Sequence, residues 1–165
     1  MLYYLIAIGI FILLKIGFIF ADNNDLVFLL KPTNKIIEFV TNSNSQYFTE
    51  SGYFHEKLDI IIDKSCSGFN FWILCYMMLT FLALRFLKHK IYKFIAIPSM
   101  LVFAYFMTIF VNASRILFSI LIDNLGEKFI NYKINWLHQA EGTFIYLFFL
   151  IVIYLGFEHL FKRLK

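Results

Sequence analysis

The sequence predicts an all-α, polytopic membrane protein with about four transmembrane helices and a mixed extracytoplasmic segment between the first two. Three observations favour this class. The chain is 61% hydrophobic with a mean hydropathy of +0.73, which is too apolar for an ordinary soluble domain. It contains 22 Phe and 10 Tyr, which suits lipid-facing and interfacial rings. Its apolar residues gather into runs long enough to span a bilayer.

The first predicted span covers residues 2–21 and is interrupted by Lys15, which can extend toward the interface. We interpret this run as a retained helix, because no basic n-region or A-x-A site accompanies it. Residues 22–64 are polar and mixed. Within them, Leu26–Val40 has helical spacing and predicts a short interfacial helix that starts or breaks at Pro32.

Residues 41–51 are rich in Asn, Ser and Thr, and predict a loop. Residues 53–63 alternate partly between apolar and polar side chains, which predicts a strand or small hairpin leading to Cys66. Three further spans follow at residues 68–84, 94–122 and 143–157. Residues 123–141 form a second polar loop. The whole chain, residues 1–165, is therefore expected to be one integral membrane domain.

Charge placement predicts the orientation of the spans. The segment from Arg85 to Lys93 carries four basic residues and no acid, and the tail carries three basic residues with Glu158. The polar segments 22–64 and 123–141 together hold six Lys and ten acidic residues. By the positive-inside tendency, both termini and the basic loop are cytoplasmic. The clusters flank apolar runs, so they indicate membrane topology and lipid contact rather than nucleic-acid binding.

Reactive side chains converge at the outer membrane boundary in this topology. Cys66 precedes the second span, with the small Ser67–Gly68 step directly after it. Arg115 lies 21 positions beyond Phe94, a helical rise of roughly 32 Å that is close to one hydrocarbon thickness. His138 precedes the fourth span. A Cys, an Arg and a His are thus expected to share one depth and one pocket.

These residue types support acyl transfer through a thioester. A thiolate is the nucleophilic form of Cys, and His138 can take the thiol proton and return it to a leaving amine. Arg115 can hold an oxyanion or a carboxylate with its forked donors. Asn112 is expected to share the helix face of Arg115, and to orient it or donate a second hydrogen bond.

Each residue also has a simpler explanation. Cys66 can be a small buried residue, Arg115 a headgroup anchor and His138 an interfacial side chain. His55, His89 and His159 are expected to be solvated or to face headgroups, and Cys75 to be packing. Two cysteines nine positions apart are too distant on one helix for a disulfide. No close His or Cys pair predicts a metal site, and no cofactor is expected.

The ordered motifs SCSGFNF, NASR and HQAEG resemble those of the exosortase/archaeosortase family, most closely its compact K-type members. They contain Cys66, then Asn112 and Arg115, and finally His138 and Gly142. The resemblance implies a cysteine peptidase or transpeptidase with Cys66 as nucleophile, His138 as acid/base and Arg115 as oxyanion or substrate group. Its substrates would be exported proteins that end in a short motif, a transmembrane helix and a basic tail.

The resemblance further implies an inner-membrane location with the active site on the periplasmic side. Two other functions fit the residues. A non-enzymatic assembly or lipid-binding protein would use Arg115 to contact headgroups. A lipid acyltransferase would use Cys66 with a different substrate.

Overall fold

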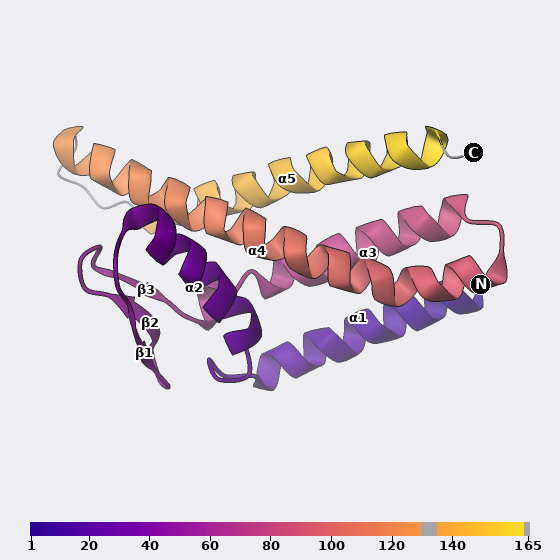
Figure 1. The fold of residues 1–165 in the computed structure, drawn as a ribbon, viewed down its shortest axis with the longest axis horizontal. Coiled ribbons are helices and arrows are strands. Elements are labelled where there is room, and N and C mark those ends of the chain that lie inside the picture. The colour runs from indigo at the N-terminus through magenta and orange to yellow at the C-terminus, as the bar shows by residue number, and fades with distance from the viewer. Residues whose placement is uncertain (130–134, 164–165) are drawn as a thin grey trace. The chain divides into compact units, whose positions relative to one another are not determined.

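The computed structural model describes the backbone of residues 1–129 and 135–163 and the side chains of residues 1–122 and 142–163. Five α-helices, three short strands and one 3-10 turn, η1, make up the described chain (Figure 1). Helix accounts for 76% of it, which confirms the predicted all-α class with a small β element. In chain order the elements are α1 (Leu2–Phe20), α2 (Val27–Thr41), β1 (Gln46–Phe48), β2 (Gly52–His55), β3 (Ile60–Ile62), η1 (Lys64–Cys66), α3 (Phe69–Phe86), α4 (Lys90–Phe129) and α5 (Asn135–Arg163).

Four of the described segments are long and apolar enough to cross a membrane, so the protein is a multi-pass membrane protein. They are Leu2–Phe20, Lys64–Phe86, Lys90–Ile122 and Gly142–Arg163. The backbone helices extend further than the apolar runs. α4 begins at Lys90 and continues to Phe129, and α5 begins at Asn135. Much of the predicted loop 123–141 is therefore helical, because polar residues do not by themselves end a helix that is already formed.

The chain divides into two compact units. The first contains Met1–Ala21, Phe69–Thr108 and Phe149–Lys165. In it, α1 packs along α3, with ring stacking between Tyr4 and Phe81 and between Phe18 and Phe69. Lys15 is exposed, and its Nζ donates a 2.7 Å hydrogen bond to Asn70 Oδ1 on α3. A cation inside an apolar span gains more from a protein acceptor than from a hydrocarbon environment.

α3 supplies most of the core of this first unit. Phe71, Tyr76 and Leu79 are almost completely buried, whereas Ala7 is the buried residue of α1. Trp72 Nε1 donates to the carbonyl of Leu101 over 3.0 Å, so the α3 ring also fixes α4. α3 is therefore the interior helix of the unit, and most of α1 presents its apolar side chains outward, as a lipid-facing helix requires.

The second unit contains Asp22–Gly68 and Ile109–Phe148. Its α2 helix is amphipathic, with a buried stripe consisting of Leu29, Leu30, Thr33, Asn34 and Ile37. Pro32 lies inside α2 and neither starts nor breaks it, contrary to the sequence expectation. The missing Pro N–H removes one helical hydrogen bond, and the buried stripe on both sides of it holds the helix together.

Three antiparallel strands form a small sheet in the order β1-β2-β3. Tyr47 is opposite Tyr53, and Phe54 is opposite Ile61. β1 lies in a stretch that the sequence predicts as loop, since cross-strand pairing of Tyr47 with Tyr53 outweighs the local preference of its Asn and Ser neighbours. Gly52 has φ +88°, and a Cβ there would collide with the Ile62 carbonyl. The sheet leads the chain directly from β3 to Cys66.

Candidate active site

Cys66 ends the short 3-10 turn η1, and Asp63 shapes that turn. The Asp63 carboxylate accepts hydrogen bonds from the Ser65 amide at 2.9 Å and from the Ser65 hydroxyl at 2.6 Å. It also accepts a longer bond from the Cys66 amide, which donates at 2.9 Å to the Asp63 carbonyl as well. Asp63 thus acts as an N-cap. The main chain of Cys66 is fixed on its amide side.

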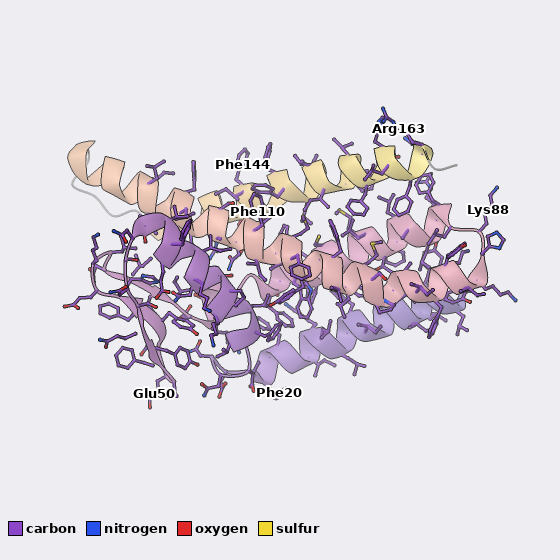
Figure 2. The ribbon with its side chains drawn as sticks, viewed as in Figure 1. Phe20, Glu50, Lys88, Phe110, Phe144 and Arg163 are labelled. Atoms are coloured by element: carbon purple, nitrogen blue, oxygen red, sulfur yellow. The ribbon has the colours of Figure 1, made fainter. Side chains whose placement is uncertain are left out.

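The segments on either side of this turn are also held. Asn23 Oδ1 accepts from the Lys64 amide at 2.7 Å, and Asn23 Nδ2 donates to the carbonyl of Glu50 at the end of the first hairpin (Figure 2). After Cys66, Ser67 is buried, and Gly68 has φ +73°. A positive φ allows the chain to turn sharply into α3 at a small energetic cost only when the residue is glycine. Ser67 and Gly68, both predicted as supporting residues, therefore form the exit of the turn.

Asn112 on α4 holds the other side of Cys66. Its Nδ2 donates to the Cys66 carbonyl oxygen over 2.6 Å. Its Oδ1 accepts a 2.6 Å hydrogen bond from the hydroxyl of Tyr146 on α5. Asn112 is completely buried, and both polar ends of its amide are satisfied, as a buried amide requires. The sequence predicts that Asn112 orients Arg115 or donates a second hydrogen bond; in the structure its hydrogen bonds go to Cys66 and Tyr146.

Arg115 lies three positions beyond Asn112, and its guanidinium carbon sits 5.2 Å from the centre of the Tyr146 ring. This is a cation–π contact. Gly142, one turn before Tyr146 on α5, leaves room for the guanidinium, since a Cβ there would lie 3.3 Å from Arg115 Nη1. Among the described residues the ion pair is Lys162 with Glu158, so no described carboxylate neutralises Arg115.

Tyr146 brings these groups into one cluster. Its hydroxyl interacts electrostatically with both Cys66 and Arg115. Cys66 is half-buried and free, with its sulfur 3.7 Å from the Ser65 hydroxyl. Because that hydroxyl donates to Asp63, its lone pairs face the thiol. Segments that are far apart in the sequence thus bring a thiol, a guanidinium and two hydrogen-bonding side chains together.

His138, the predicted acid/base, belongs to the first turn of α5, and its side chain lies outside the described residues. The convergence of all three predicted catalytic groups therefore stays a prediction. No group of three or more His, Cys, Asp and Glu side chains in the described ranges is arranged to hold a metal ion.

The family described as transmembrane exosortase matches residues 38–155 of this chain. The chain belongs to the transmembrane exosortase family. None of the curated proteins or solved structures that were compared with it gives a match. Exosortase membership supports a role as a membrane transpeptidase or protease that acts on exported proteins with sorting signals.

The exosortase match begins inside α2 and ends inside α5. It therefore includes the sheet, η1 and every residue of the Cys66 cluster, whereas α1 lies outside it. Tyr146 and Asp63 belong to this cluster, although the sequence analysis does not single them out. The spacing of Gly142 and Tyr146, one helical turn apart, is the only sequence signal that could have placed Tyr146 on the face of a motif residue.

His55 is not solvated, contrary to the sequence expectation. It is completely buried between α2 and β2, with Nε2 at 2.7 Å from Asn34 Oδ1 and Nδ1 at 2.9 Å from Ser43 Oγ. Asn34 Nδ2 donates to Ser45 Oγ, so Asn34 Oδ1 faces His55 and accepts the proton of Nε2. Burial lowers the pKa of His55, and the nearby Glu38 carboxylate partly opposes this.

The same polar network continues to Glu38. Its carboxylate accepts from the Ser45 hydroxyl at 2.6 Å and from the Ser45 amide at 3.0 Å. The hydroxyl bond holds the pKa of Glu38 below its usual value, although burial acts in the opposite direction. This network fixes the start of β1 to α2. In the exosortase this network joins α2 to the sheet that carries the chain to Cys66.

Proposed function

We propose that this chain is a membrane-embedded cysteine transpeptidase that cleaves C-terminal sorting signals through a thioester on Cys66. One observation carries the proposal. Asn112 and Arg115, one turn apart on α4, reach respectively the Cys66 carbonyl and the ring of Tyr146, and the Tyr146 hydroxyl donates in turn to Asn112. A nucleophile and a cation held by the same helix face suit chemistry in which negative charge develops on a substrate carbonyl.

The proposed reaction has two steps. First, Cys66 Sγ attacks the scissile carbonyl carbon while its proton passes to His138. Arg115 stabilises the negative oxygen of the tetrahedral intermediate, the C–N bond breaks, and His138 gives the proton to the leaving amine. Second, an acceptor amine, alcohol or water attacks the thioester, and its proton passes to His138. The C–S bond then breaks, the leaving Cys66 sulfur takes the proton back from His138, and the enzyme is restored.

The proposed substrate is an exported protein that ends in a short motif, a transmembrane helix and a basic tail. The substrate helix would enter from the lipid beside the apolar α4 and α5 surfaces, where Phe110 and Phe144 are largely exposed (Figure 2). In this proposal membrane lipids surround the substrate helix and also contact the protein surface as partners. The arginine is the group that would meet the substrate carbonyl, because its planar fork binds oxygen pairs or an oxyanion.

We further propose that the whole chain is one integral membrane domain of the K-type, with both termini cytoplasmic. The basic residues from Arg85 to Lys93 span the end of α3, the connection 87–89 and the first turn of α4, and Lys88 lies in that connection (Figure 2). Their clustering supports a cytoplasmic loop. The Cys66 cluster would then face the periplasm at the inner membrane.

The decisive experiment compares three variants in cells that co-express an exported reporter carrying such a C-terminal signal. Cys66→Ala and Cys66→Ser should abolish its processing, whereas Cys75→Ala should not, because Cys75 is a fully buried packing residue of α3. Equal processing by wild type and Cys66→Ala would remove the proposal. The mass of the adduct trapped on Cys66 separates a peptide thioester from a fatty acyl thioester, and thereby a transpeptidase from a lipid acyltransferase.

A further inference from the structure

Tyr146 is the residue through which the Cys66 turn and the Arg115 guanidinium are connected. It contributes two different surfaces to the cluster. Its hydroxyl donates to Asn112 Oδ1 at 2.6 Å, and its ring supports Arg115 at 5.2 Å. Neither contact follows from the catalytic roles assigned to Cys66, His138 and Arg115, so the function of Tyr146 requires a separate account.

The directions of the hydrogen bonds are fixed by chemistry. A main-chain carbonyl can only accept, so the Asn112 atom that faces Cys66 must be the amide nitrogen. The amide oxygen then faces Tyr146 and needs a donor, which the phenol provides. If the Asn112 amide were reversed, its oxygen would face the Cys66 carbonyl oxygen, and two acceptors would repel each other. The Cys66 carbonyl therefore selects this orientation of Asn112, and the Tyr146 hydroxyl supplies the donor that the amide oxygen then needs.

The position of Asn112 in a membrane span strengthens the need of its amide oxygen for a donor. Asn112 and Tyr146 both belong to candidate membrane spans, and Asn112 has no exposed surface. Water is scarce at such a position, and a polar group that loses its partner there has no ready replacement. The amide of Asn112 thus depends on Tyr146 more than an exposed amide would. The effect reaches Cys66 because the same amide holds the cysteine carbonyl.

We infer that Tyr146 is a positioning residue: its hydroxyl locks the Asn112 amide onto the Cys66 carbonyl, and its ring sets the position of Arg115 relative to the sulfur. The inference rests on the proposed function for its catalytic consequence. Its structural consequence, a fixed Cys66 turn, does not depend on activity. Tyr146 takes no proton and touches no reacting atom in this scheme; it acts through Asn112 and Arg115.

The first test removes only the oxygen atom. Tyr146→Phe keeps the ring beneath Arg115, whereas Tyr146→Leu removes ring and hydroxyl together. Tyr154→Phe is the matched control, since it deletes the same atom two turns further along α5. In the purified full-length protein, hydrogen exchange of the amides from residue 64 to residue 68 should accelerate about tenfold in Tyr146→Phe and remain at the wild-type rate in Tyr154→Phe. Equal exchange in both variants would refute the inference, and this measurement needs no substrate.

The second test asks whether Tyr146 acts through Asn112. Processing by Tyr146→Phe should show a kcat reduced about tenfold with little change in KM, because the enzyme binds substrate but holds its nucleophile poorly. In an Asn112→Ala background the Tyr146→Phe change should cost almost nothing more, since its acceptor is already gone. Full additivity of the two changes would show that Tyr146 does not act through Asn112. A change confined to KM would indicate a substrate contact instead.

The outcomes separate this inference from the proposed function. If Cys66→Ala remains active, the transpeptidase mechanism fails, yet the exchange measurement still decides whether Tyr146 fixes the Cys66 turn. If Cys66→Ala is inactive but Tyr146→Phe matches Tyr154→Phe in exchange and kcat, the mechanism stands and the positioning role is wrong. Should Tyr146→Phe fail to fold, Asn112→Ala must by itself accelerate exchange at residues 64–68, and an unchanged rate would overturn the inference.

Discussion

The Asn112 amide nitrogen lies 2.6 Å from the main-chain carbonyl oxygen of Cys66, so Asn112 on α4 holds the main chain of Cys66 in place. Asn112→Ala removes the amide that donates to that carbonyl and the oxygen that accepts from the Tyr146 hydroxyl. We expect a loss of about 1–3 kcal/mol in the free energy of unfolding, since two buried polar groups lose partners. Thermal unfolding of the detergent-solubilised protein measures this loss.

Ser114→Ala is the control for this change, because the Ser114 hydroxyl returns to the Phe110 carbonyl of its own helix. It should leave the midpoint of unfolding within about 1 °C of wild type, consistent with a replaceable helix-surface contact. A matching loss in both variants would mean that the Asn112 effect is a general property of α4 and does not reflect the contact with Cys66.

Gly142→Ala tests the space that Arg115 occupies. The added Cβ would lie 3.3 Å from Nη1 and 3.4 Å from Cδ of Arg115, so the guanidinium must move away by a few tenths of an ångström. We expect turnover to fall about fivefold, because small displacements of a charge-stabilising group are costly in catalysis. The unfolding midpoint should not fall, since alanine improves helix propensity by about 1 kcal/mol. Gly156→Ala, with nothing within 4 Å of its new Cβ, should keep full turnover, and an equal loss there would remove the steric explanation.

His55 predicts how stability responds to pH. Its pKa in the folded protein is lowered from the ordinary value of 6.5 by burial, so the unfolded chain binds this proton more readily. Stability is therefore complete above about pH 6.5 and declines as the pH falls below that value, with a slope of at most about 1.4 kcal/mol per pH unit. The decline ends once His55 is protonated in the folded state as well.

The measurement is thermal unfolding between about pH 8 and about pH 5. The range stops above the ordinary pKa of Glu38, 4.5, because the lowered pKa of Glu38 would also reduce stability at more acidic pH. His55→Gln should flatten the profile in this range. His89→Gln, at an exposed position between α3 and α4, should keep the wild-type slope. A His55→Gln protein with an unchanged slope would assign the pH dependence to other groups.

Gly68→Ala should destabilise the protein by about 1–2 kcal/mol, because its φ of +73° is strained for any residue that carries a Cβ. Gly17→Ala is the comparison, since nothing lies within 4 Å of a Cβ at that position in α1. It should stabilise the helix by about 1 kcal/mol. Chemical denaturation in mild detergent would compare the two, and a stable Gly68→Ala protein would show that the turn before α3 tolerates another path.

Those parts of the fold that depend on local sequence are predictable. The spans follow from hydropathy, which is a property of consecutive residues. Pro32 is the counterexample. Its local preference predicts a helix end, but burial of Leu29, Leu30 and Ile37 outweighs one missing hydrogen bond. β1 likewise depends on pairing with β2, and residues 46–48 by themselves do not predict a strand.

The residues of the candidate site were likewise predictable only in part. Residue type together with position nominated Cys66 and Arg115 from the sequence, because a thiol and a guanidinium at the same end of two spans suit acyl transfer. Tyr146 could not be nominated, since it is one of 10 tyrosines and only its contacts across to α4 distinguish it. The contacts of Asn112 with Cys66 and Tyr146 could not be predicted, because helix periodicity identifies neighbours on the same helix and not groups delivered by other segments.

Cys66 is held from two directions, with its amide bonded to Asp63 and its carbonyl bonded to Asn112. The sulfur can then change position chiefly by rotating about its own Cα–Cβ bond. An acyl group attached to it cannot be carried to a distant recipient, as a flexible carrier would do. In a transpeptidase built this way the recipient molecule has to travel to the stationary thioester, and the leaving helix has to vacate that place first.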